Sequence, residues 1–174
     1  MKSIYLLVFT FILGPGCINK SENINLIYSD SLISDYGLGL EMNYYFDGDL
    51  EFKLIAQEIQ ELKYPVEKNV FPNGVKVLVF NKNFDTIAKI NSDFAVQKKE
   101  EKLVELSNNV FLINEKNEQL STEKLFWNSE EKKIYTDSFV TITTDNEIIM
   151  GYGFSANQSF SNYSLLNITG TIYL

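Results

Sequence analysis

The chain has 174 residues and a formal net charge of −8, with no histidine and a single cysteine. Its length fits one domain, and its 45% hydrophobic content, including 13 phenylalanines and 10 tyrosines, suffices for an apolar core without disulfides. The absence of histidine excludes Ser-His-Asp triads, Cys-His pairs and imidazole metal sites. The acidic balance disfavours nucleic acid, because phosphate binding needs clustered lysines and arginines. We expect no catalytic residues, no metal and no cofactor, although these counts leave chemistry by carboxylates alone possible.

The N-terminal residues have the features of an export signal. Lys2 gives a basic start, Ile4 to Leu13 form a short apolar run, and Gly14-Pro15-Gly16 lead directly to Cys17. A membrane-spanning helix needs roughly 20 apolar residues, so an uncleaved transmembrane anchor is the weaker interpretation of this short run. We expect residues 1–17 to be a signal peptide that ends at a lipoprotein cysteine, with Cys17 carrying a lipid anchor.

The segment after the signal is polar and rich in Ser and Asn, which is typical of a tether. We expect residues 18–38 to hold the folded domain, residues 39–174, away from a membrane. The domain opens with a hairpin pattern: Tyr44 to Phe46, the Asp47-Gly48 turn, and alternating apolar and charged residues from Leu50 to Leu54. Asp-Gly predicts a tight primed turn, because both positions accept a positive φ.

The rest of the domain alternates in the manner of strands separated by turn residues. The further strands that we expect are Val75 to Phe80, Phe84 to Ile90, Phe94 to Val96, Leu103 to Leu106, Val110 to Ile113, Gln119 to Trp127, Lys133 to Tyr135, Phe139 to Thr143, Ile148 to Phe154, Tyr163 to Leu166 and Ile168 to Tyr173. Turns are expected at Asn108-Asn109, Asn128-Ser129, Asp145-Asn146 and Ser159 to Asn162. A helix is the alternative from Leu54 to Tyr64, where apolar residues recur at helical spacing, although a strand or irregular structure is favoured there. The fold class predicted is all-β.

A weak internal repeat indicates a stack of hairpins. Similar short segments begin at Gly74, Asn109, Phe139 and Asn167, at spacings of about 30 to 35 residues. A hairpin cannot bury its own apolar face, so stacked copies would share one continuous interior. The side chains expected on that shared face are Val77, Val79, Val110, Leu112, Val140, Ile142, Ile168 and Ile172.

Two other features have competing interpretations. Gly151-Tyr-Gly153-Phe-Ser-Ala156 matches a dinucleotide fingerprint, but a polar loop from Asn157 to Asn162 follows where a helix should begin, which favours strand glycines at a bend. Trp127 could stack on a sugar or anchor a partner, yet a lone Trp in an alternating strand is usually part of the core.

The hairpin pattern resembles the LptC family in the order and approximate spacing of its motifs. The segments that carry the resemblance are Ala56 to Tyr64, Phe71-Pro72 with Val75-x-Val77-x-Val79-Phe80, Leu103-x-x-Leu106-x-x-x-Val110-x-Leu112, Leu125 to Trp127, Ile134 to Asp137, Val140-x-Ile142 and Gly151-x-Gly153-x-x-Ala156-Asn157. The resemblance implies an open, twisted antiparallel β-jellyroll, boat-like in shape, whose apolar groove shields the acyl chains of lipopolysaccharide. It further implies a periplasmic, inner-membrane-anchored, non-enzymatic transfer protein. Typical members keep an uncleaved transmembrane helix, whereas this chain has Cys17.

The resemblance also implies partners. They are the inner-membrane permease of an ABC transporter and a soluble periplasmic bridge protein of the same fold. We assign the shared apolar face to the lipid groove, and we expect the bridge protein to add a strand to the terminal edge, with the early strand near Met42 to Phe46 facing the permease. The expected edge residues are Gly170, Thr171, Ile172, Tyr173 and Leu174.

Other functions remain open from the residues alone. An outer-membrane or surface β-sandwich lipoprotein that binds glycan or protein would have a filled core and an aromatic surface platform. A glycosidase would need two carboxylates facing each other across a cleft. A continuous apolar groove favours lipid transfer over both.

Overall fold

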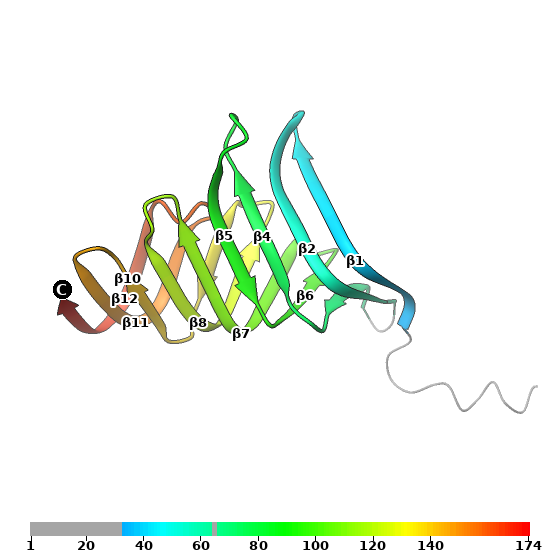
Figure 1. Ribbon diagram of the computed structural model, residues 1–174. Coiled ribbons are helices and arrows are strands. Elements are labelled where there is room, and N and C mark those ends of the chain that lie inside the picture. The colour runs from blue at the N-terminus through cyan, green and yellow to red at the C-terminus, as the bar shows by residue number, and fades with distance from the viewer. Residues whose placement is uncertain (1–32, 64–65) are drawn as a thin grey trace, which may run out of the picture.

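A computed structural model describes residues 33–63 and 66–174, and its regular structure there consists of β-strands alone (Figure 1). They form one 12-stranded sheet in which the paired strands are antiparallel, which confirms the predicted all-β class. The strands are β1 (Ile33–Phe46), β2 (Asp49–Leu62), β3 (Lys68–Phe71), β4 (Val75–Phe80), β5 (Thr86–Ser92), β6 (Phe94–Lys98), β7 (Leu103–Asn114), β8 (Gln119–Asn128), β9 (Lys133–Thr136), β10 (Val140–Thr143), β11 (Glu147–Asn157) and β12 (Tyr163–Tyr173). The predicted signal and Cys17 lie outside the described residues. Among those residues, no helix has the length and apolar character needed to cross a membrane.

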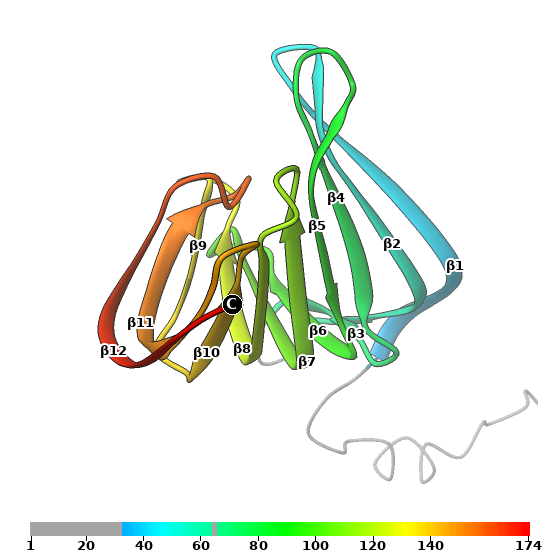
Figure 2. The same ribbon diagram turned by 60° about the vertical axis from the view of Figure 1, so that its left-hand side comes forward.

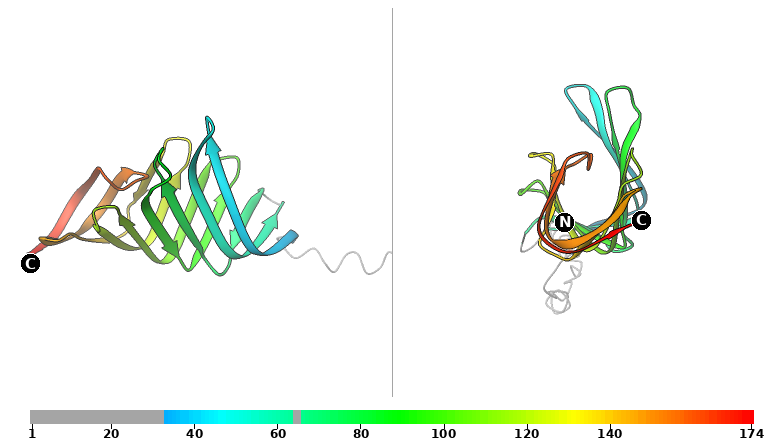
Figure 3. Two further views of the ribbon diagram at one scale, coloured as in Figure 1. Left: turned by 45° about the horizontal axis from the view of Figure 1, so that its top comes forward. Right: turned by 90° about the vertical axis from the view of Figure 1, so that its left-hand side faces the viewer.

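The sheet folds into two facing walls because its long strands change partners halfway. The first half of β2 pairs with β4 and its second half with β3, while β8 pairs with β10 and then with β9. We call β4, β5, β10 and the strand halves paired with them the first wall, and β3, β6, β9 and their paired halves the second wall. The strands pass between the walls along a common bend, which gives the U-shaped end view of Figure 3.

Positive φ angles and bulges shape this bend. In β7, Asn108 and Asn109 have φ of 63° and 50° at a bulge between Ser107 and Val110, and Gly153 has φ of 75° in β11. The predicted turn at Asn108-Asn109 is therefore wrong: the chain bends there without reversing, because the bulge keeps one strand continuous. The break predicted between Leu166 and Ile168 is likewise absent, since both lie in β12.

The N-terminal hairpin is confirmed by the turn between β1 and β2. Asp47 and Gly48 have φ of 50° and 89°, as a primed turn requires. The helical alternative from Leu54 onward is wrong, because the described residues of that segment up to Leu62 continue β2 with Leu54 and Ala56 buried on one face. The pairing of β1 begins at Ile33, so residues 33–38 form a strand where a tether was expected.

The hydrophobic core fills the space between the walls. The strands β2 to β11 bury side chains of their inner face, the edge strands β1 and β12 add only partly buried ones, and residues of both walls form one connected cluster. Trp127 of the second wall meets Phe52 of the first edge to face, with ring centroids 4.5 Å apart, and Tyr44 stacks on Phe52. The structure thus confirms that Trp127 is a core residue. Figure 2 shows the sheet ending in β1 on one side and in β12 on the other.

Candidate functional site

The residues that were predicted for the groove and lie in the first wall come together on its inner face. Each faces the interior, and each is at most 1% exposed to solvent. They are Val77 and Val79 of β4, Val110 and Leu112 of β7, and Val140 and Ile142 of β10. The repeat has a structural explanation, because these three strands all run from the bend to the free end of the first wall.

The other two predicted groove residues, Ile168 and Ile172, lie in the edge strand β12 and are 60% and 51% exposed. Ile172 pairs with Ile148, whereas the inward-facing Ile142 pairs with Ile149. Neighbouring residues of a strand point to opposite faces, so Ile172 points outward. A bulge at Met150-Gly151 shifts the register of β12, and nothing in the repeat indicated that shift.

The sequence reasoning missed the other half of the interior, which the second wall supplies. Its largest fully buried side chains on strands are Phe71, Leu106, Leu125, Trp127, Ile134 and Phe154. The alternation at the second-wall end of β8 was a usable signal, because Leu125 and Trp127 lie two positions apart and are both buried. The candidate site is therefore a two-sided apolar interior running the length of the sheet.

The walls are tied together at their free ends, opposite the bend. We call these ends the rim, made of turns 47–48, 81–85, 115–118 and 144–146 of the first wall and turns 99–102, 129–132 and 158–162 of the second. Lys132 forms an ion pair with Glu51 across the rim and lies 4.6 Å from the ring centre of Phe46. Nearer β12, the Asn114 side chain Nδ2 donates to the backbone oxygen of Phe160 at 2.9 Å.

Tyr163, at the second-wall end of β12, is also affected by the opposite wall. Burial raises the pKa of its hydroxyl above the ordinary 10.0, and the Glu118 and Glu147 carboxylates raise that pKa further. Both carboxylates belong to the rim side of the first wall, so the two walls are close together here.

The raised pKa of Tyr163 predicts a loss of stability in alkali. As the pH rises past about 10, the unfolded chain releases this proton before the folded protein does. The contribution of Tyr163 to the free energy of unfolding is therefore complete below that pH and is lost above it. Between pH 9 and pH 12 we expect Tyr163→Phe to lose stability less steeply than the wild type in urea denaturation followed by circular dichroism. Equal slopes of the free energy of unfolding against pH in the two proteins would contradict this prediction.

The two edge strands carry large apolar side chains in the open. In β12, Leu166 is 79% and Tyr173 is 81% exposed, and in β1 Tyr36 and Leu38 are also exposed. Within the described residues, β12 pairs only with β11, and β1 only with β2. A free strand edge with exposed apolar side chains is suited to pairing with a strand of another protein.

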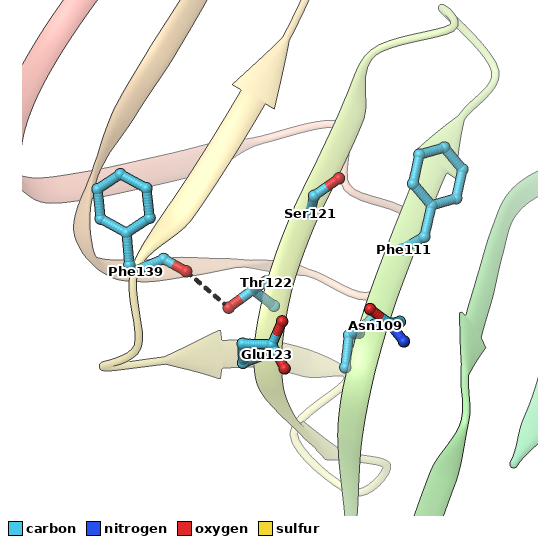
Figure 4. Close-up of a pocket in the computed structure, with 7 residues that line it drawn as sticks. Asn109, Phe111, Ser121, Thr122, Glu123 and Phe139 are labelled. Atoms are coloured by element: carbon cyan, nitrogen blue, oxygen red, sulfur yellow. Dashed lines mark hydrogen bonds between the residues drawn. The ribbon is translucent and has the colours of Figure 1, made fainter.

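A depression of about 420 Å³ lies on the outer side of the first wall near the bend (Figure 4). Phe111, Ser121, Glu123 and Phe139 line it, and the Thr122 hydroxyl donates to the Phe139 backbone oxygen at 2.8 Å. It contains one carboxylate, whereas glycoside hydrolysis needs two. Across the described ranges, no group of three or more Asp, Glu, Cys or His residues is placed to hold a metal ion.

Comparison with known proteins agrees with the architecture. The family model described as lipopolysaccharide-assembly, LptC-related, matches residues 23–174, which include the whole described sheet. A comparison with curated proteins found no match. Since the matched segment is far more than half of the chain, this protein belongs to the LptC family of lipopolysaccharide export components.

Proposed function

We propose that this chain is a non-enzymatic carrier that holds the acyl chains of lipid A between its two walls. It would receive lipopolysaccharide from the inner-membrane permease of an ABC transporter and pass it to a soluble periplasmic bridge protein. The observation that supports this most is a single apolar core extending through the two-walled sheet, with a free edge at each end (Figure 1). An acyl chain of about a dozen carbons gains on the order of 10 kcal/mol when it leaves water, so a carrier must shield it throughout.

The two edges suggest a direction of transfer. The strand Gly170 to Leu174 would pair with the bridge protein, and the part of β1 from Met42 to Phe46 would face the permease. The sequence has no Gly-Lys-Ser or Gly-Lys-Thr phosphate loop, so energy would come from nucleotide hydrolysis by the partner ATPase. We further propose that a lipid on Cys17 anchors the protein to the periplasmic side of the inner membrane, with a transmembrane anchor as the alternative.

Photo-crosslinking in cells tests the partner edge. A photoreactive amino acid at Thr171 or Tyr173 is expected to trap the bridge protein, because both positions lie in the free edge strand. Lys89 serves as the control, since it is exposed on β5 in the middle of the sheet and should trap nothing. The proposal is wrong if lipopolysaccharide reaches the cell surface while neither edge position captures a partner.

A surface lipoprotein that binds glycan is the second candidate. It is favoured by the filled core and by Phe139 and Tyr152, two exposed aromatic residues whose ring centroids are 5.2 Å apart. Aromatic faces of this kind stack on sugars or anchor a protein partner. Binding of the purified protein to glycan, together with no binding to dispersed lipid A, would favour this alternative over the carrier.

A further inference from the structure

Lipid can enter the interior only where side chains move away, because the core cluster already fills it. Among the fully buried aromatic side chains, Phe160 differs in its attachment. Phe71, Trp127 and Phe154 project from strands, whereas Phe160 projects from the rim loop 158–162. A loop can move without breaking the pairing of a sheet, so Phe160 is the buried aromatic residue that can leave most easily.

The ring of Phe160 occupies an apolar site between β11 and β12. Its centroid lies 5.8 Å from that of Phe154 and 5.2 Å from that of Tyr163. The backbone of Phe160 has φ of 55°, a conformation that phenylalanine rarely adopts without support from its surroundings. The position of this side chain is thus held by a few specific contacts.

One of those contacts crosses the rim. Asn114 accepts hydrogen bonds from the backbone N–H groups of Lys116 and Glu118 through its Oδ1, which fixes the orientation of its amide. Its Nδ2 therefore points toward the loop and donates to the Phe160 backbone oxygen at 2.9 Å. Asn114 thereby fastens a loop of the second wall to the first wall.

The position of the loop also leaves a polar atom unsatisfied. Within the described residues, the buried Gln158 Oε1 has no hydrogen-bond partner. Gln158 belongs to the same loop, so outward movement would return its oxygen to water. An unsatisfied buried polar atom disfavours the closed position and makes the loop easier to release.

We propose that Phe160 fills an acyl-chain site at the β12 end of the interior, and that loop 158–162 swings outward when a lipid chain takes the place of its ring. The inference rests on the proposed carrier function and identifies one part of its lipid site. Exchange of an aromatic ring for methylene groups substitutes one buried apolar group for another. The net free energy gained when a lipid chain binds at this position is therefore small. A small gain favours release of the lipid at the end of the interior where it would leave.

Two substitutions weaken the inward position of loop 158–162 in different ways. Phe160→Ala removes the ring. Asn114→Asp keeps the shape and the Oδ1 acceptor of the turn, but it loses the Nδ2 donor and places a negative charge beside Glu118 and the Phe160 carbonyl oxygen. If either variant fails to fold, the other still tests the proposal.

The chain offers a matched control for each variant. Asn128 caps a rim turn in the same manner, accepting from the N–H groups of Glu130 and Glu131, and it has no bond to the opposite wall among the described residues. Phe126 lies on the outer face of the second wall, stacked on Tyr135. We therefore pair Asn114→Asp with Asn128→Asp, and Phe160→Ala with Phe126→Ala.

The experiment titrates the membrane-extracted full chain with dispersed hexa-acylated lipid A and follows the emission of Trp127, the only tryptophan. The apparent affinity for lipid A decreases as the fraction of protein with the Phe160 ring inside the interior increases. Phe160→Ala and Asn114→Asp, the release variants, are therefore expected to bind lipid A about tenfold more tightly than the wild type, and the two controls are expected to bind it as the wild type does. Simple structural damage would instead weaken binding. Wild-type binding without a gain in the release variants overturns the loop proposal alone, whereas absence of lipid A binding in every protein overturns the carrier function as well.

Discussion

Gly74→Ala is expected to lower the free energy of unfolding by at least about 4 kcal/mol, a large fraction of the roughly 5–15 kcal/mol that stabilises a typical domain. Gly74 stands at the bend where the chain passes from β3 to β4, with φ of 73°. An added Cβ would lie 1.9 Å from the backbone oxygen of Ser92 and 2.8 Å from the Cα of Asp93. Both atoms belong to the backbone where β5 ends and the chain turns into β6, so relief of the clash requires the bend itself to open.

Gly48→Ala is the control that separates the destabilisation caused by a steric clash from the destabilisation caused by a positive φ. Gly48 has an even larger positive φ of 89°, but its added Cβ would have nothing within 4 Å. Only the conformational cost of about 1–2 kcal/mol should remain. Urea denaturation followed by far-ultraviolet circular dichroism measures both variants. Equal losses of stability would show that close approach of the backbone does not limit residue 74.

Trp127→Ala is expected to lower the free energy of unfolding by about 3–5 kcal/mol, because it leaves a large cavity in the core. Trp127 is 1% exposed and joins the walls through its edge contact with Phe52. Its Nε1 has no hydrogen-bond partner in the described part of the chain, so loss of packing accounts for the effect. Trp127→Phe should therefore retain most of the stability.

Phe126→Ala is the matched control in the same strand. Phe126 points outward, is half-buried, and stacks on Tyr135 with centroids 5.4 Å apart. Loss of this contact is expected to reduce stability by about 1 kcal/mol. Circular dichroism serves as the readout, since tryptophan fluorescence is lost in one variant. A loss at Phe126 as large as that at Trp127 would contradict the two-walled arrangement.

The sequence allowed the local features of this fold to be predicted. The Asp47-Gly48 turn follows from the φ preferences of two residues, and the alternation in β4 follows from burial of one face of a strand. Half of the interior could be assigned for the same reason, because Val77, Leu112 and Ile142 recur in equivalent strands of the first wall. Such patterns need only neighbours along the chain.

The missed features depend on distant contacts. The strand β3 is short and follows a charged stretch, and it becomes a strand by pairing with β2 and β6. Asn108-Asn109 has the composition of a turn, but the neighbouring strands keep β7 continuous through it. The bond from Asn114 to Phe160 joins residues 46 positions apart, and no spacing rule connects them.

The nesting of strand pairs constrains how the chain folds. The strands β3 and β6 pair through Lys68 and Lys98, while the whole β4–β5 hairpin lies between them in sequence and belongs to the other wall. Pairing β3 with β6 while the chain between them is unstructured would cost much chain entropy. If the β4–β5 hairpin forms first, it brings β3 and β6 close together and lowers that cost. Folding should therefore proceed outward from the hairpin whose tip is residues 81–85.

Asn81 stabilises this tip, because its side chain accepts hydrogen bonds from the N–H groups of Asn83 and Asp85. Substitution of Asn81 should therefore slow refolding more than it speeds unfolding.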